Sequence, residues 1–350
     1  IAEKNILKSL LIRIETNKGI VGWGESFGYT SIETTKAALQ SMVIPQLIGK
    51  NIESIDDINV INKELQLKLH IFGRYGITMF ALSGIDIALW DIIGKIENKS
   101  VADLLGGLKT NSLTAYASLF LYDDANATAK VSIKAKNEGY EIIKLHENTI
   151  DPIKSSRNAI GDTALMVDVN CVWTEKHMEE ILNPLKEAQL YWLEEPIWPP
   201  ENYEGLSKLR DEGMTIASGE NACTSYQFEE MISKNAADIL QPSVTKVGGI
   251  SEIIKISKLK KNNNRVVPHS PYFGPGFIAT LQVIGALIPD SEIERLYIDL
   301  KADLYEGVNN IDKNGKIHIP NGPGLGIEPN IEILEKFSQN KFNYTFMLDK

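Results

Sequence analysis

The sequence predicts an α/β protein in which a closed barrel of parallel strands follows a smaller α+β domain. Its 350 residues are 43% hydrophobic and 23% charged, an ordinary globular composition with room for both parts. From about Thr114 onward, short apolar segments alternate with amphipathic segments, which is the pattern of repeated β/α units. Nearly every apolar segment ends in a polar side chain, which is typical of the functional face of a barrel.

Residues 1–110 are expected to form the α+β domain. Residues 6–27 have the pattern of a β-hairpin, because two apolar, β-prone runs flank a turn at Thr16–Gly19. Residues 31–105 have a helical pattern, which is strongest from Ile77 to Ile96.

Residues 111–304 are expected to form the barrel, because eight apolar segments separated by helices favour a closed parallel sheet. Residues 305–350 contain a short β-like run at Lys316–Ile319 and a helix, and we expect them to pack back on the front domain. The expected barrel strands are Leu113–Phe120, Glu141–His146, Ala164–Asn170, Leu190–Pro196, Thr215–Asn221, Asp238–Val244, Arg265–Pro271 and Ile293–Leu300.

A series of polar residues recurs at the ends of these strands, 22 to 26 positions apart, which is about the length of one β/α unit. Barrel active sites lie at the carboxyl-terminal face, where several strand ends converge. Burying so many polar groups together is unfavourable unless they serve a ligand or a metal. The series consists of His146, Asp168, Glu194, Glu220, Ser243, His269 and Glu294.

Three of these residues, Asp168, Glu194 and Glu220, are acids at the ends of adjacent strands. Three converging carboxylates would repel one another and raise each other's pKa values unless a cation compensates them. Oxygen ligands favour Mg²⁺, or Mn²⁺ in its place, and zinc is disfavoured because no Cys or His belongs to the set. The alternative is that the three acids form structural salt bridges with Lys or Arg.

Composition argues against several classes of partner. The net charge is −10 and basic residues form no long run, so nucleic acid is not expected to bind. No apolar run reaches about 18 residues, so no membrane span is expected. No signal peptide is recognisable, and two cysteines, Cys171 and Cys223, are too few for a disulfide framework. A cytoplasmic location is therefore expected.

Characteristic motifs occur in order along the chain. The front part contains Gly22-Trp-Gly-Glu25, the helix Ala81-Leu-Ser-Gly-Ile-Asp-Ile-Ala-Leu-Trp-Asp91, and Leu104-Leu-Gly-Gly107. The barrel part contains Lys144-Leu-His146, Asp168-Val-Asn170, Leu193-Glu-Glu-Pro196, Ser218-Gly-Glu-Asn221, Lys246-Val-Gly-Gly249, Pro268-His-Ser270 and Glu294-Arg-Leu296. In this order the motifs resemble those of the mandelate racemase/muconate lactonizing enzyme family of the enolase superfamily, over essentially the whole chain.

The resemblance implies a modified TIM barrel of the (β/α)7β type, whose α+β N-terminal capping domain is completed by the C-terminal segment. It also implies that Asp168, Glu194 and Glu220 hold Mg²⁺. The metal would bind the carboxylate of a small-molecule substrate and stabilise the enediolate formed when the α-proton leaves. We also expect a homo-oligomer.

Lys144 and His146 are the first candidates for the base, because residues two apart on a strand point to the same side. The family usually has Lys at both positions, and neutral imidazole can accept a proton near pH 7. Lys144 would then act mainly as a cation beside the substrate carboxylate, although it could be the base itself. The alternative is that the pair lines the barrel in a structural salt bridge.

Three further residues are candidate catalysts by the resemblance. His269 would normally pair with an Asp at the end of the sixth strand, but Ser243 stands there. Lys246 aligns with a second catalytic Lys, although a structural role is equally compatible. Glu294 resembles a residue that hydrogen-bonds substrate, the alternative being an ion pair with Arg295.

The remaining candidates are substrate contacts. The front domain should choose the substrate through two capping loops, Ser26–Thr30 and His70–Tyr75. The candidate contacts are Phe27, Tyr29, Arg74, Tyr75, Asn170 and Ser243.

The predicted reaction is dehydration of a hydroxylated carboxylate such as an acid sugar. Ser243 carries no charge, so His269 should be a poor base but could still assist the loss of hydroxide. The alternatives are a racemase, epimerase or cycloisomerase that uses the same enolisation, or a catalytically inactive homologue that binds metal or ligand.

Overall fold

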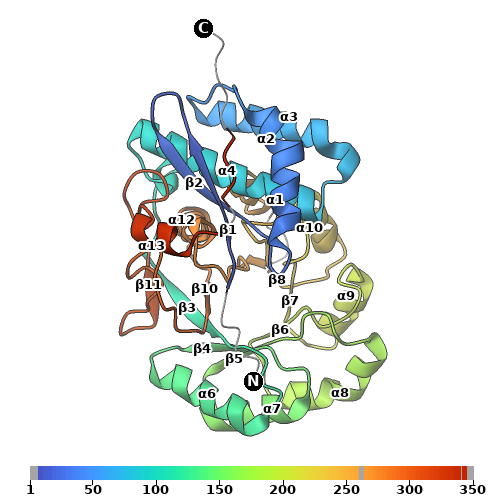
Figure 1. Cartoon of the computed structure of the whole chain (residues 1–350). Helices are drawn as coiled ribbons and strands as arrows, with labels where there is room; N and C mark the ends of the chain where they lie inside the picture. Colours follow the sequence, from blue (N-terminus) through green and yellow to red (C-terminus); the bar gives the residue numbers. More distant parts are fainter. Residues whose placement is uncertain (1–6, 260–263, 340, 345–350) are drawn as a thin grey trace.

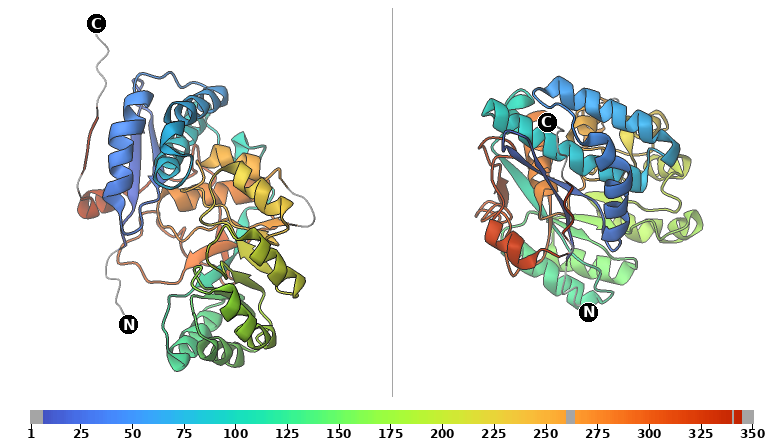
Figure 2. Two further views of the ribbon diagram at one scale, coloured as in Figure 1. Left: turned by 90° about the vertical axis from the view of Figure 1, so that its right-hand side faces the viewer. Right: turned by 45° about the horizontal axis from the view of Figure 1, so that its top comes forward.

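The computed structural model describes residues 7–259, 264–339 and 341–344. Ile6, the first residue of the predicted hairpin, lies outside them. Figures 1 and 2 show the front-domain helices (blue to cyan) at one end of the molecule and helices α6 to α8 (green) at the other. The barrel strands lie between these two groups.

The front domain begins with the expected hairpin. Strand β1 (Leu10–Glu15) pairs antiparallel with β2 (Val21–Ser26), and the turn between them is held by hydrogen bonds between Thr16 and residues 19 and 20. The helices that follow are α1 (Ile32–Ala38), η1 (Leu39–Val43), α2 (Ile44–Leu47), α3 (Ile55–Leu69), η2 (His70–Phe72), α4 (Gly76–Glu97) and α5 (Val101–Leu104).

Helix α4 packs directly on β2, and this contact explains the glycines of the Gly-Trp-Gly-Glu motif. A Cβ atom on Gly22 would lie 2.3 Å from the carbonyl oxygen of Ala88, and one on Gly24 would lie 2.0 Å from that of Gly84. Only glycine allows strand and helix to approach so closely.

Helix α4 bears on the expectation that the chain has no membrane span. By length and composition alone it is apolar enough to cross a membrane. In the structure 83% of its most apolar window is buried inside the protein. Its apolar character is explained by its place between the hairpin and the barrel.

The barrel sheet follows chain order, as predicted. Among the described residues the parallel ladder runs β10-β3-β4-β5-β6-β7-β8-β9. The strands are β3 (Ser112–Ser118), β4 (Ile142–Leu145), β5 (Ala164–Asp168), β6 (Trp192–Glu194), β7 (Ile216–Ser218), β8 (Ile239–Leu240), β9 (Arg265–Val266) and β10 (Ile293–Leu296). The barrel helices are α6 (Ala125–Asn137), α7 (Ile150–Ile160), α8 (Glu175–Glu187), α9 (Tyr203–Asp211), α10 (Thr224–Ser233), α11 (Ile250–Ile256) and α12 (Pro275–Leu287).

The strands are shorter than predicted at their carboxyl-terminal ends. As a result Glu220, Ser243 and His269 lie in the loops that follow β7, β8 and β9, not on the strands. The predicted closed ladder is also wrong at one seam, since no ladder joins β9 to β10 within the described residues. Strand β9 has only two residues, and across this gap the Ser270 backbone amide donates to the Glu294 side chain, 3.0 Å away.

Side chains inside the barrel form layers that follow the two-residue period of the strands. One buried apolar layer consists of Tyr116, Ile142, Met166, Trp192, Ala217, Ile239 and Val267. Two positions further along β3, β4, β5 and β6 the side chains are polar: Ser118, Lys144, Asp168 and Glu194. The sheet therefore presents a polar layer toward its carboxyl-terminal face.

The C-terminal segment contacts both parts of the molecule. Strand β11 (Lys316–His318) pairs antiparallel with β3, so it joins the barrel sheet, a pairing that the sequence did not predict. Beyond it the Leu325 amide donates to Asp91 of α4, as expected for a return to the front domain. Helix α13 (Ile331–Phe337) follows. The domain limits at residues 110 and 304 remain predictions.

Glu25, at the end of the Gly-Trp-Gly-Glu motif, ties the front domain to the barrel. Its side chain is buried and accepts a hydrogen bond of 2.9 Å from the Gly276 amide, in the first turn of α12. Burial raises the pKa of Glu25 from 4.5 to about 7, although the hydrogen bond from Gly276 acts in the opposite direction.

This burial predicts a pH-dependent stability difference for Glu25→Gln. A carboxyl whose pKa is higher in the folded protein binds its proton more tightly there, so the parent loses stability as pH rises from 4.5 to about 7. The variant keeps an acceptor for Gly276 and avoids this loss, so above about pH 8 it should be more stable by up to roughly 3 kcal/mol. Thermal unfolding across this range measures the difference. The exposed Glu332→Gln is the control, and a pH-independent difference would contradict the expectation.

Candidate active site

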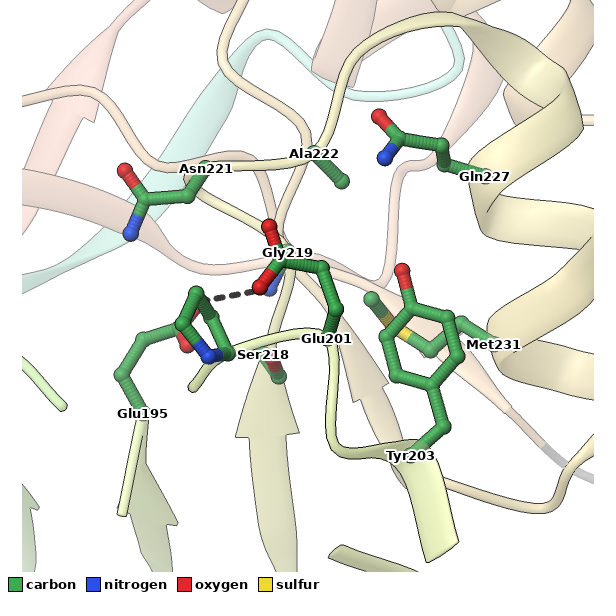
Figure 3. A pocket seen from close by; sticks show the side chains of 10 residues that line it. Glu195, Glu201, Tyr203, Ser218, Gly219, Asn221, Ala222, Gln227 and Met231 are labelled. Atoms are coloured by element: carbon green, nitrogen blue, oxygen red, sulfur yellow. Dashed lines mark hydrogen bonds between the residues drawn. The ribbon is translucent and has the colours of Figure 1, made fainter. Parts of the chain in front are cut away.

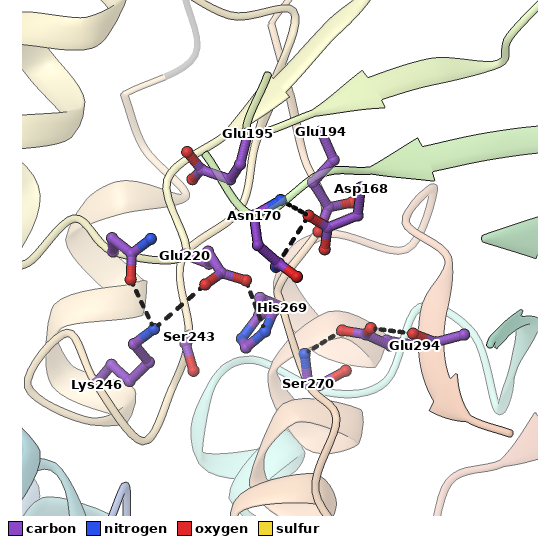
Figure 4. A network of polar contacts seen from close by, with 12 residues as sticks. Asp168, Asn170, Glu194, Glu195, Glu220, Ser243, Lys246, His269, Ser270 and Glu294 are labelled. Carbon is purple, nitrogen blue, oxygen red and sulfur yellow. Dashed lines mark hydrogen bonds and ion pairs between the residues drawn. The ribbon is translucent and has the colours of Figure 1, made fainter. Parts of the chain in front are cut away.

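Three carboxylates meet at the polar end of the barrel, as their spacing predicts. Asp168 and Glu194 are the last residues of β5 and β6, and Glu220 lies two residues beyond β7. One oxygen from each lies within 4.8 Å of the others, and Figure 4 shows the three side chains converging. Asp168 and Glu194 are fully enclosed, and Glu220 has a side chain only 14% exposed.

The charges of this group fit a divalent cation. Burial raises the pKa of Glu194 well above its usual value; the charge of Lys144 acts in the opposite direction, and the charges of Asp168 and Glu294 add to the rise. Burial also acts on Glu220, but the nearby His269 and Lys246 outweigh it and lower the pKa to about 2. An added cation would favour the ionised form of all three, and buried oxygen donors of this kind are the ligands that Mg²⁺ and Mn²⁺ prefer.

Lys144 projects from β4 into the same layer. Its ammonium group lies 2.8 Å from Glu194, 2.9 Å from Glu294 and 3.4 Å from Asp168, and its side chain is fully buried. Burial alone would lower the pKa of Lys144, but these carboxylates outweigh it and hold the pKa well above its ordinary value. The amine is therefore a poor proton acceptor in this arrangement and a strong local cation.

His146 follows β4 directly and points to the same side as Lys144, as predicted. Its Nδ1 contacts the carbonyl oxygen of Leu119, and its Nε2 lies 3.2 Å from Asp168. A carbonyl can only accept, so Nδ1 carries a proton and Nε2 is the nitrogen that can exchange one. Burial would lower the pKa of His146, but the charge of Asp168 and its hydrogen bond raise it above the usual value.

Glu294 does not pair with its neighbour Arg295, which was the alternative considered from the sequence. Its carboxylate contacts Lys144, the hydroxyl of Ser118 at 2.8 Å and the Ser270 amide at 3.0 Å. The Arg295 guanidinium instead donates to backbone carbonyls, including that of Asn309. The two side chains point to opposite sides of β10, as neighbours on a strand do.

His269 lies on the Glu220 side of the cluster, 3.0 Å from that carboxylate through Nε2. Ser243 does not reach its ring. The Ser243 hydroxyl bonds to the hydroxyl of Tyr272, and the Tyr272 oxygen lies 3.5 Å from Nδ1 of His269. A tyrosine therefore stands between the residue expected to be the partner and the histidine.

Lys246 occupies the same side of the cluster as His269. Its ammonium group lies 3.8 Å from Glu220 and 3.4 Å from the Asn221 amide oxygen. It also lies over the ring of Phe27, 4.7 Å from the centroid. Lys246 thus links the capping loop to the cluster.

The backbone beside the cluster is held by further contacts. Asn170 has a left-handed backbone, φ 48°, and donates from its amide and its side chain to Asp168. Glu195 accepts from the Gly219 amide at 2.8 Å, and burial raises its pKa to about 7. These contacts fix the loops that carry the three acids.

The capping-loop candidates divide into two groups. Phe27 contacts Lys246, its ring lies 6.4 Å from that of Tyr272, and Tyr29 stacks on it at 6.2 Å. Arg74, in contrast, donates to Gln66 and lies over the ring of Tyr226, and Tyr75 is largely exposed. The structure brings the first loop to the cluster, and no contact of the cluster with Arg74 or Tyr75 is found among the described residues.

A small pocket is lined by Glu195 and by residues of the neighbouring loops. Figure 3 shows it between Glu195, Gly219, Tyr203 and Met231. None of Asp168, Glu194 and Glu220 lines it. We therefore treat it as a gap between the loops around Glu195 and not as part of the carboxylate cluster.

Sequence reasoning missed two groups that touch the predicted residues. Ser118 sits one β/α unit before Lys144 at the same strand position, so the strand-end series could have included it. Tyr272 follows His269 by three residues in a loop, and no periodicity marks it. Only the folded loop brings its hydroxyl back to the ring.

Comparison with known proteins supports the fold and identifies the family. Residues 5–106 match the N-terminal domain model of mandelate racemase / muconate lactonizing enzyme, and residues 127–333 match the enolase C-terminal domain-like model. D-galactarolactone cycloisomerase of Agrobacterium fabrum is 33% identical, over 94% of this chain and 90% of that protein. Arabinonate dehydratase of Saccharolobus solfataricus is 32% identical, over 93% and 89%.

Solved structures agree. The 3,6-anhydro-D-galactonate cycloisomerase from Zobellia galactanivorans superposes with a TM-score of 0.84 at 28% identity, covering 95% of this chain and 94% of that one. A mandelate racemase/muconate lactonizing protein from Paracoccus denitrificans, complexed with magnesium, shares the fold at 22% identity, with a TM-score of 0.86 and coverage of 94% and 92%. The predicted modified TIM barrel with its capping domain is confirmed. This chain belongs to the mandelate racemase/muconate lactonizing enzyme family of the enolase superfamily.

Proposed function

We propose that this protein removes the α-proton of a hydroxylated carboxylate and then expels its β-oxygen, so that an acid sugar is dehydrated to a keto acid. One observation carries the proposal: proton-transfer groups lie on two sides of the carboxylate cluster. Lys144 and His146 adjoin Asp168, whereas His269 and Lys246 adjoin Glu220. A substrate carbon between them would have a base on one side and an acid on the other.

The base in this proposal is His146. Its Nδ1 is committed to the Leu119 carbonyl, so its Nε2 faces the cluster as the exchanging nitrogen. Lys144 is enclosed by three carboxylates and serves as a cation near the substrate carboxylate. The tautomer of His146 is thus set by its contact with the Leu119 backbone carbonyl.

The acid is His269, whose Nε2 also faces the cluster. It donates a proton to the departing β-oxygen, which leaves as water while the carbon–oxygen bond breaks. In the part of the chain that the structure describes, the contact on the Nδ1 side of its ring is with the Tyr272 hydroxyl, which in turn contacts the Ser243 hydroxyl. A histidine that only protonates a leaving group depends less on a carboxylate behind its ring than a histidine that must abstract an α-proton.

Asp168, Glu194 and Glu220 would hold Mg²⁺, with Mn²⁺ as a substitute. When bound, the ion supplies Lewis-acid stabilisation of the negative charge that develops on the substrate carboxylate. Asn170 then orients Asp168, and Phe27 and Tyr29 wall the site from the capping loop.

The names of the relatives agree with the two predicted classes of reaction. Arabinonate dehydratase matches the first, and D-galactarolactone cycloisomerase matches the alternative. A small sugar acid is therefore the proposed substrate class. We further propose that the protein is a cytoplasmic homo-oligomer. Racemisation or epimerisation stays a second candidate, because Lys246 lies close to Glu220 opposite the Lys144 side and could supply a second base.

Incubation with Mg²⁺ and a library of aldonic, aldaric, hydroxy and amino acids in D₂O tests the proposal. Nuclear magnetic resonance should show a keto acid accumulating from one or more sugar acids. Inversion at the α-carbon with deuterium incorporation and no loss of water would overturn dehydration and make Lys246 the second catalyst. The absence of exchange for every ligand that binds would indicate an inactive binding protein.

A further inference from the structure

The Nδ1 side of His269 is enclosed by hydroxyl groups. The Tyr272 oxygen lies 3.5 Å from Nδ1, and the two rings meet edge to face, with centroids 6.0 Å apart at 84°. The side chains of Tyr272, Ser243 and His269 are all buried. A buried ring nitrogen needs a partner, and the phenol is the group placed to provide it.

The contacts of Tyr272 indicate the direction of this hydrogen bond. Its hydroxyl contacts the Ser243 hydroxyl more closely than it contacts His269, and Ser243 in turn lies 3.4 Å from the Thr245 hydroxyl. A phenol is more acidic than an aliphatic alcohol, so Tyr272 donates to Ser243. Its lone pair is then left to accept from His269. Burial raises the pKa of Tyr272 above its ordinary value, so the phenol keeps its proton.

The other ring nitrogen has a different neighbour. Nε2 lies 3.0 Å from Glu220 and faces the carboxylate cluster. If Nδ1 is always the protonated nitrogen, every proton that His269 gains or loses passes through Nε2. In the neutral ring this leaves a lone pair on Nε2, so His269 donates to the site as the imidazolium, in which both nitrogens carry protons.

We infer that Tyr272, supported by Ser243, is the positioning residue of His269. Its hydroxyl accepts from Nδ1–H and reserves Nε2 for the proton that reaches the departing oxygen. The hydroxyl pair replaces the carboxylate that the resemblance places behind this histidine, and it orients the ring without adding a negative charge. The catalytic consequence rests on the proposed function, whereas the orientation of the ring does not.

Tyr272→Phe removes the hydroxyl and keeps the ring. Turnover should fall roughly tenfold or more, because a misoriented donor loses its alignment with the leaving group. KM should change little, and α-proton exchange in D₂O should stay near the parent rate, since it takes place on the His146 side. Ser243→Ala should cause a smaller loss of the same kind. Tyr191→Phe, whose hydroxyl contacts Glu292 and Arg265 away from the cluster, is the matched control.

Nitrogen-15 spectra of His269 in the Mg²⁺-loaded protein test the orientation without any substrate. Nδ1 should carry a proton in the parent and lose this preference in Tyr272→Phe. A parent ring protonated only at Nε2 would overturn the inference, as would parental turnover in Tyr272→Phe or an equal fall in exchange and turnover. If Tyr272→Phe does not fold, the parent spectrum and Ser243→Ala decide the question. Failure of the proposed function would appear separately, as a parent protein that exchanges no α-proton.

Discussion

Glu220→Gln should abolish turnover while leaving the fold intact. The substitution keeps the size of the side chain but replaces a charged metal ligand with a neutral amide. It also removes the carboxylate that faces both His269 and Lys246. The parent should lose activity in excess EDTA and recover it with Mg²⁺ or Mn²⁺. Turnover assays with and without each ion measure this effect.

The same variant should lose stabilisation by the metal. An ion that binds only the folded protein raises its stability by about 2.7 kcal/mol at one hundred times Kd. Thermal unfolding with and without Mg²⁺ should therefore show a rise in Tm for the parent and a smaller one for the variant. Glu201→Gln alters an exposed acid outside the cluster and serves as the control. Full parental activity in excess EDTA would refute the metal assignment.

His146→Asn should lower kcat by roughly 10²-fold or more, the usual scale for loss of a general base. Asparagine can still donate to the Leu119 carbonyl, so the loop after β4 should keep its position. Steady-state kinetics measure the effect, with the exposed His177→Asn as the control. A variant with near-parental kcat would transfer the role of base to Lys144 or Lys246.

Lys144→Met tests whether Lys144 acts as a cation beside the substrate carboxylate or as the base. Because Lys144 touches Asp168, Glu194 and Glu294, its loss should raise KM as well as lower kcat, since a cation beside the substrate carboxylate disappears. The metal-free variant should also be less stable, because a buried cation no longer compensates the carboxylates. A fall in kcat alone, with KM unchanged, would indicate that Lys144 is the base and not the cation.

The sequence by itself determined the architecture and the meeting of the three acids. Both depend on local periodicity: a hairpin pattern, helical repeats, and polar residues spaced by one β/α unit. Asp168, Glu194 and Glu220 converge because successive parallel strands end at one face, whatever the details of packing. Lys144 and His146 share a side for the same reason, since the side-chain period of a strand is two.

Only the tertiary structure decided the partners of these residues. Glu294 pairs with Lys144 across the barrel instead of with Arg295, Arg74 is committed to Gln66, and Tyr272 intervenes between Ser243 and His269. These contacts join residues from different strands, helices and loops. They depend on strand register, on how soon each strand ends and on the path of the loop beyond it. Sequence periodicity places a side chain on a face, but the group it touches there is set by how separate segments pack.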